Sequence, residues 1–318
     1  MKIRVSRWIF VAAISIGVAA CVSGPGSFVP IGQNAAAESR ASQIMGSSRS
    51  GELAVAQLNE WYADTTHDCG SATRPAFLCS GVMLRATDTD PAFLPWDPSP
   101  NAVQKGGIAA SWLRADTNFP STVLPNGFIF FPDYDIPTGK IALAILCAFP
   151  LDGNTWERPT LQGCGQHRTD PQSRPCHELG ITTSQGWIAN YNAVPPAVHP
   201  THSHQCGWDV REGSPATSDR FYQNILARAA LSSAHWQFVD EVIVQTWPTG
   251  VGASLPIQSF FYKSGDGQAL SDARNDQQRY FNLYRIALPI IRLTLPSSPA
   301  GRAQFAYDPA DQVVIPTN

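Results

Sequence analysis

The sequence predicts an α+β fold, in which a mixed, largely antiparallel twisted sheet packs with a few helices and with disulfide-stapled loops. Short β-like runs occur in groups without a helix after each one, which argues against a doubly wound α/β fold. Proline and glycine, with 26 and 24 residues, separate these runs. With 318 residues, 43% of them hydrophobic, the chain can bury a sizeable core.

The expected strands and helices follow from the spacing of the apolar residues. Three segments have apolar residues near helical spacing, including Leu53, Leu58, Trp61 and Tyr62 in the first. These helical segments are 51–64, 218–231 and 267–286. The β-like runs are 81–87, 108–114, 127–131, 141–149, 241–247, 257–262 and 303–307.

The amino terminus has the features of an export signal. Lys2, Arg4 and Arg7 are followed by an apolar run of thirteen residues, Trp8–Ala20, shorter than the ~20 residues that span a bilayer. A stretch rich in glycine, serine, alanine and proline comes next. We therefore expect a signal peptide, a flexible tether and a single globular domain of catalytic type, at residues 1–20, 21–50 and 51–318.

Cys21 is a candidate lipidation site. Val18, Ala19, Ala20 and Cys21 are similar to the lipobox of bacterial lipoproteins, whose cysteine becomes the lipidated first residue. The alternative is cleavage by the ordinary signal peptidase, which leaves Cys21 unmodified. We favour the lipoprotein, and we expect an exported protein that is either an outer-membrane lipoprotein or extracellular, with membrane contact only through a lipid anchor.

The net charge of the mature chain argues against a protein that binds nucleic acid. Removal of residues 1–20 takes away three basic and no acidic residues, so 19 Lys+Arg face 25 Asp+Glu and the net charge is −6. No basic face that could bind nucleic acid is visible.

Apart from Cys21, six cysteines remain, and three disulfides are expected in an oxidising compartment. The local pairs Cys69–Cys79 and Cys164–Cys176, with Cys147–Cys206 as a long one, are our first choice among fifteen pairings.

Several common catalytic motifs are absent from the sequence. It contains no G-x-S-x-G, no phosphate-binding G-x-x-x-x-G-K-S/T and no H-E-x-x-H, and its glycine pairs do not complete a dinucleotide fingerprint. His199, His202 and His204 near Cys206 resemble a metal cluster. A polar loop beside a disulfide is the simpler interpretation, so we expect no metal.

Arg85 is an unusual residue for its position. Alternation in an antiparallel strand places Val82, Leu84 and Ala86 on one face and Met83 and Arg85 on the other. A half-buried guanidinium needs a partner, and its planar fork suits a phosphate or carboxylate. The alternative is an arginine at a sheet edge that points to solvent or pairs with a nearby acid.

Much of the chain after the tether resembles the halovibrin family of secreted bacterial proteins. The resemblance rests on LNEWYADTTHDCGSATRPAFLCSGVMLRAT, WDPSP, GGIAASWLRAD, NGFIFFP, HSHQCGWDVR and DQQRYFN. It implies an exported enzyme that acts on NAD as an NAD glycohydrolase or ADP-ribosyltransferase, and it implies an ADP-ribosyltransferase-like fold. NAD would be the substrate, with no other cofactor, and a protein target for ADP-ribose would be an additional partner.

The resemblance also suggests site residues. Enzymes of the arginine–serine–glutamate type carry an arginine in an early strand, a serine in a following strand and a late glutamate. Arg85 and Ser111 are similar to the first two elements, and Glu241 is our candidate for the third. Arg85 would hold the phosphates or ribose of NAD, Ser111 would orient the nicotinamide ribose, and Glu241 would stabilise an oxocarbenium-like state. Val239 stands where many transferases have a second Glu or Gln, so water is the favoured acceptor.

Two other classes of function compete with this hypothesis. The first is a non-catalytic envelope lipoprotein with a binding role, since nine tryptophans and fifteen phenylalanines fit a recognition face as well as a core. The second is a metal-dependent hydrolase built on the three histidines.

Overall fold

A computed structural model describes twelve segments of the chain, all within the compact unit Ser42–Asn318. They are residues 43–44, 47–65, 79–87, 94–97, 102, 107–132, 135–151, 164, 175–193, 205–209, 239–245 and 252–315. The expected signal peptide, with Cys21, and the expected helix 218–231 lie outside these residues. None of the helices in these segments is long and apolar enough to cross a membrane.

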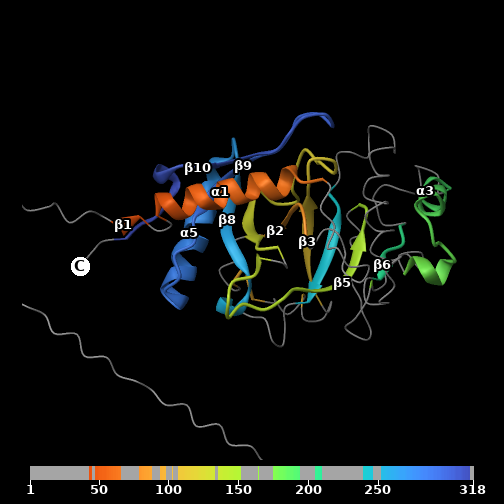
Figure 1. Cartoon of the computed structure of the whole chain (residues 1–318), viewed down its shortest axis with the longest axis horizontal. Coiled ribbons are helices and arrows are strands. Elements are labelled where there is room, and N and C mark those ends of the chain that lie inside the picture. Colours follow the sequence, from red (N-terminus) through yellow and green to blue (C-terminus); the bar gives the residue numbers. More distant parts are fainter. Residues whose placement is uncertain are drawn as a thin grey trace, which may run out of the picture. The chain divides into compact units, whose positions relative to one another are not determined.

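The main element of the fold is an open nine-stranded sheet with the order β10-β9-β8-β4-β2-β3-β7-β5-β6 (Figure 1). Its strands are β2 (Val82–Ala86), β3 (Ile108–Leu113), β4 (Asn126–Phe130), β5 (Ala144–Phe149), β6 (Trp208–Asp209), β7 (Glu241–Gln245), β8 (Ile257–Lys263), β9 (Ile290–Thr294) and β10 (Gln304–Tyr307). Every strand pair in the described segments is antiparallel except β8–β9. The predicted α+β class with a largely antiparallel sheet is therefore confirmed.

The remaining elements are short strands and helices. The strands β1 (Gln43–Ile44) and β11 (Val314–Ile315) pair with each other, away from the main sheet. The helix α1 begins at Ser48, three residues before the expected domain boundary at 51. The helical elements are α1 (Ser48–Ala63), α3 (Ser184–Asn192), α5 (Gly267–Tyr284), η3 (Cys176–Leu179), η7 (Gly252–Ser254) and η8 (Pro309–Asp311).

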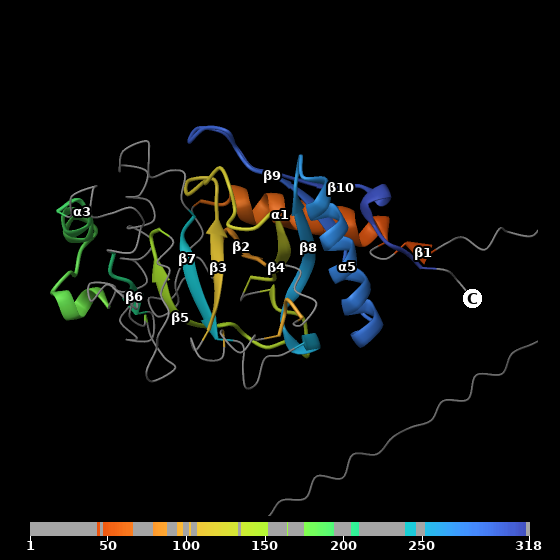
Figure 2. The same ribbon diagram turned by 180° about the vertical axis from the view of Figure 1, so that it is seen from behind.

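Helices α1 and α5 cover opposite faces of the sheet (Figures 1 and 2). On one face, Leu58 and Trp61 of α1 pack with Leu84 and with apolar residues of β9 and β10. On the other face, Ala273 and Tyr280 of α5 pack with apolar residues of β4 and β8. Both helices contribute the apolar stripes that the sequence predicted. Leu53, however, is 58% exposed, because Ala54 occupies the buried position on α1.

The segment β8–α5–β9 explains why one strand pair is parallel. Parallel neighbours need a long crossover connection, and α5 supplies it between β8 and β9. The helix begins at the N-cap Asp266, whose carboxylate accepts from the Ala269 amide, and it ends at Arg285 with a φ of 58°. Strand β9 was not among the expected strands.

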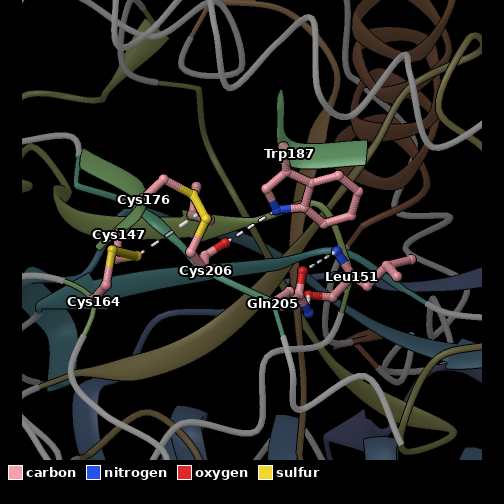
Figure 3. Close-up of a disulfide and its surroundings, with 8 residues drawn as sticks. Cys147, Leu151, Cys164, Cys176, Trp187, Gln205 and Cys206 are labelled. Carbon is pink, nitrogen blue, oxygen red and sulfur yellow. Dashed lines mark hydrogen bonds between the residues drawn. A yellow bond between two sulfur atoms is a disulfide. The ribbon is translucent and has the colours of Figure 1, made fainter. Parts of the chain in front are cut away.

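Two disulfides with both cysteines in the described segments fasten the β5–β6 end of the sheet (Figure 3). They join Cys147 to Cys164 and Cys176 to Cys206. The expected pairs Cys164–Cys176 and Cys147–Cys206 are therefore wrong. Cys79 is also disulfide-bonded, but the expected pair with Cys69 lies outside the described residues.

The observed cysteine pairing follows from a contact that sequence spacing does not reveal. Pro175 and Gly207 form a parallel bridge, and the Cys176 amide donates to the Gly207 carbonyl at 2.8 Å. This bridge brings Cys176 beside Cys206. A side chain at Gly207 would lie only 2.6 Å from the Cys147 sulfur, so glycine is needed at this position.

We expect the double variant Cys176→Ser, Cys206→Ser to lose roughly 3 kcal/mol of unfolding free energy, because its cross-link spans 30 residues. Urea unfolding under non-reducing conditions measures the loss.

A non-reducing digest of the native protein should release a peptide that contains the Cys147–Cys164 bond. A digest that yields Cys164 linked to Cys176 instead would contradict the pairing.

Asp276, on the inner face of α5, is a buried acid. It is 1% exposed, and neither of its carboxyl oxygens has a hydrogen-bond partner. Burial raises its pKa to about 7, although the nearby Arg279 acts in the opposite direction and Asp272 adds to the rise. The folded protein therefore binds a proton at Asp276 more tightly than the unfolded chain does.

We expect the raised pKa of Asp276 to make the folded state less stable as the pH rises from about 4 to about 7, by roughly 2 to 4 kcal/mol in total. Asp276→Asn should flatten this part of the stability profile, because asparagine does not titrate. Denaturant unfolding at several pH values measures the slope. Glu60→Gln, an exposed change on α1, is the control, and equal slopes in wild type and Asp276→Asn would refute the assignment.

Candidate functional site

The candidate site lies where β3 changes its pairing partner. Residues Ile108–Ala110 pair with Val242–Val244 of β7, whereas Ser111–Leu113 pair with Val82–Leu84 of β2. The β2–β3 register ends at the Leu84–Ser111 pair. Beyond this pair, the backbone of β3 on the β2 side has to find hydrogen-bond partners other than β2.

Arg85 supplies one of these partners. Its Nη1 donates to the Ala109 carbonyl at 2.6 Å, and its Nε is buried without a hydrogen-bond partner. The residue is half-buried and lies opposite Phe128, on the same face as Met83. This confirms the alternation predicted for β2.

The charge of Arg85 is only partly balanced. Among the described residues, it forms no ion pair with a carboxylate within 4.0 Å. Burial lowers its pKa to about 10, while the negative charge of Glu241 raises that pKa. Arg85 therefore remains protonated at neutral pH, and Glu241 is close enough for their charges to interact.

Ser111 and Glu241 lie on adjacent strands, β3 and β7. The pairing of Ala110 with Val242, continued by one residue, sets Ser111 opposite Glu241. Ser111 is half-buried, and its hydroxyl donates to the Asp240 carbonyl at 3.1 Å. Glu241 opens β7 and is 7% exposed.

The structure brings the three predicted residues together only in part. Arg85, Ser111 and Glu241 come from the neighbouring strands β2, β3 and β7, and Arg85 interacts electrostatically with Glu241. Arg85, however, leaves β2 on the face opposite to that of Leu84, while Ser111 pairs with Leu84 and shares its face. Glu241, which the β3–β7 register sets opposite Ser111, lies on the Ser111 face as well. The guanidinium reaches the junction at the Ala109 carbonyl, between the strands.

Asp240 belongs to the same site and was missed by the sequence analysis. It is fully buried, and its Oδ1 accepts from the Trp112 amide at 2.6 Å. A single aspartate before a strand gives no signal for such a contact in the sequence. The contact depends on the register between two segments that lie 128 residues apart.

Arg114, also missed, holds the turn before β2. It is 1% exposed, forms two hydrogen bonds to Asp116 at 2.7 Å each, and donates to the Ser80 hydroxyl at 2.8 Å. The Trp112 indole donates to the Ser80 carbonyl. Gly81, with a φ of 72°, leaves no room for a side chain against Trp112. These contacts fix the start of β2 and, through it, Arg85.

The alternative metal site loses one of its four residues. Cys206 is bonded to Cys176, and a disulfide sulfur is not the thiolate that binds metals. His199, His202 and His204 lie outside the described residues. In the part of the chain that the structure describes, no group of three or more His, Cys, Asp or Glu side chains could hold a metal ion.

No protein-family model matches the chain, and no curated protein matches it with significant similarity.

We expect Arg85→Met to change the unfolding free energy by no more than about 1 kcal/mol, because it removes one hydrogen bond and also removes a charge that folding desolvates. Guanidinium unfolding of both proteins at neutral pH measures the difference. Loss of a buried structural ion pair would instead cost about 3 to 5 kcal/mol, and a loss of that size would show that Arg85 serves stability.

Proposed function

We propose that the protein is an exported enzyme that hydrolyses the nicotinamide–ribose bond of NAD. The observation that carries the proposal is the half-buried Arg85, which remains charged and has no ion-pair partner among the described residues, within electrostatic reach of Glu241. Such an arginine is a ready site for an anion, and the buried Glu241 on β7 can face developing positive charge. The resemblance to the halovibrin family supports the same activity.

The chemistry assigns a role to Glu241. In the reaction, the bond between ribose C1′ and the nicotinamide nitrogen breaks, and its electron pair neutralises the positive charge of the ring. The ribose passes through an oxocarbenium-like state, which a nearby carboxylate stabilises. The oxygen of water then bonds to C1′ and loses a proton. NAD is the substrate, and the proposal needs no metal or other cofactor.

Arg85 and Ser111 would hold the substrate. The Nε of Arg85 is a donor that can complete a two-pronged hydrogen bond to a phosphate, while Nη1 remains on the Ala109 carbonyl. Ser111 would orient the nicotinamide ribose or Glu241 from the next strand. Its hydroxyl oxygen can still accept a hydrogen bond while it donates to Asp240.

We propose hydrolysis as the main reaction, with transfer to a protein target as a secondary one. Val239, two residues before Glu241, is 6% exposed and packs in the apolar cluster beneath α1. It offers no polar group to direct a protein side chain toward the ribose. Water can therefore act as the acceptor without competition from a group at this position.

We also propose that the protein works outside the cytoplasm. The basic and apolar residues 1–20 and the lipobox-like Cys21 support export, with lipidation of Cys21 as our first choice. The disulfides Cys147–Cys164 and Cys176–Cys206 are typical of oxidising compartments.

We expect Glu241→Gln to lower the turnover number for nicotinamide release by about 100- to 1,000-fold, because glutamine cannot supply the negative charge that stabilises the ribose cation. The assay uses purified, oxidised protein and NAD, with chromatographic detection of nicotinamide. Glu60→Gln, an exposed change on α1, should retain full turnover.

The other outcomes separate the hypotheses. Equal turnover in wild type and Glu241→Gln would retain the activity but remove Glu241 from it. No turnover in wild type that is folded and oxidised would overturn the proposed activity, and the binding lipoprotein would then be the better hypothesis.

A further inference from the structure

Asp240 replaces a backbone group in the β3–β7 ladder. Ala110 pairs with Val242, and the same register carried two residues further sets Trp112 opposite Asp240. In a regular antiparallel ladder, the Trp112 amide would donate to the backbone carbonyl of Asp240. Here, the amide donates to the Asp240 side chain instead, at 2.6 Å.

The backbone carbonyl of Asp240 has a different partner. It accepts the hydroxyl of Ser111 at 3.1 Å. The two acceptors of Asp240 thus bind two successive residues of β3, Ser111 through its side chain and Trp112 through its backbone. The Trp112 contact is held away from water, since Asp240 and Trp112 are fully buried.

This arrangement fixes the peptide that leads into Glu241. The carbonyl of Asp240 belongs to the peptide bond between Asp240 and Glu241, so the Ser111 hydrogen bond restrains the rotation of that peptide. The side chain of Asp240 anchors the same residue to β3 a second time, through the Trp112 amide.

We propose that Asp240 is a positioning residue, which sets Glu241 against Ser111. This inference rests on the proposed hydrolysis of NAD, because it assigns Glu241 a substrate to face. Asp240 itself does not contact the substrate. Its role is to hold the carboxylate of Glu241 where the ribose cation develops, and a misplacement of about 1 Å can cost a hundredfold in rate.

The test compares two substitutions at the same position. Asp240→Ala removes the acceptor, whereas Asp240→Asn retains a side-chain oxygen that can accept from the Trp112 amide. We expect Asp240→Ala to lower kcat per folded molecule about 100-fold with KM changed less than threefold. Asp240→Asn should restore kcat to within about tenfold of wild type.

A carboxylate away from the site provides the control. Asp311→Ala removes the acceptor of the Tyr262 hydroxyl and leaves the Asp240 contacts intact. We expect this variant to have a lower melting temperature and unchanged kcat per folded molecule. Hydrogen exchange of the Trp112 amide, followed by NMR, should accelerate in Asp240→Ala and remain slow in Asp240→Asn.

The outcomes distinguish this inference from the proposed function. A wild type that turns over NAD together with an Asp240→Ala variant of normal kcat would overturn the positioning role and leave the activity standing. If Asp240→Ala does not fold, an Asp240→Asn variant with slow Trp112 exchange but kcat below a hundredth of wild type would overturn it as well. A wild type without turnover would overturn the proposed function, and the positioning role with it.

Discussion

The structure depends on one constraint: every buried backbone group of β3 must find a hydrogen-bond partner. This strand lies between the β2 side and the β7 side of the sheet, and it pairs with each over only half of its length. At the change of partner, side chains take over the pairing. Arg85 binds the carbonyl of Ala109, and Asp240 binds the amide of Trp112. The candidate site is therefore a consequence of how the sheet is joined.

The buried Asp276 and the half-buried Arg85, two ionisable groups on the same side of the sheet, show why Arg85 is the better candidate for a ligand. Asp276 and Arg85 both lack a close ion-pair partner within the described residues. The pKa of Asp276 rises to about 7, so this carboxyl can take up a proton, and its neutral form costs less free energy to bury than its charged form. The pKa of Arg85 falls only to about 10, so its guanidinium stays charged under all mild conditions. A permanent charge that has a neutral hydrogen-bond partner and no close ion pair is well suited to bind an anion.

The features that the sequence could predict are those with local causes. Alternation along β2 placed Met83 and Arg85 on one face, and apolar spacing located α1 and α5, because these patterns repeat within a few residues. Strand β9 was missed, since its identity depends on pairing beside β8 after a long helix. The cysteine pairs and Asp240 could not be predicted for the same reason. Their partners are chosen by the register of distant segments, which short-range spacing does not encode.

The shortness of β6 has a consequence for how the protein behaves in a crowded compartment. An exposed sheet edge offers unpaired backbone groups on which another chain can add a strand. The strand at the edge of this sheet has only two residues, Trp208 and Asp209, and the disulfide of Cys206 holds the chain just before them. Within the residues that the structure describes, so short an edge strand gives a second molecule few groups to pair with. The sheet can thus be wide and open at this end without becoming a template for aggregation.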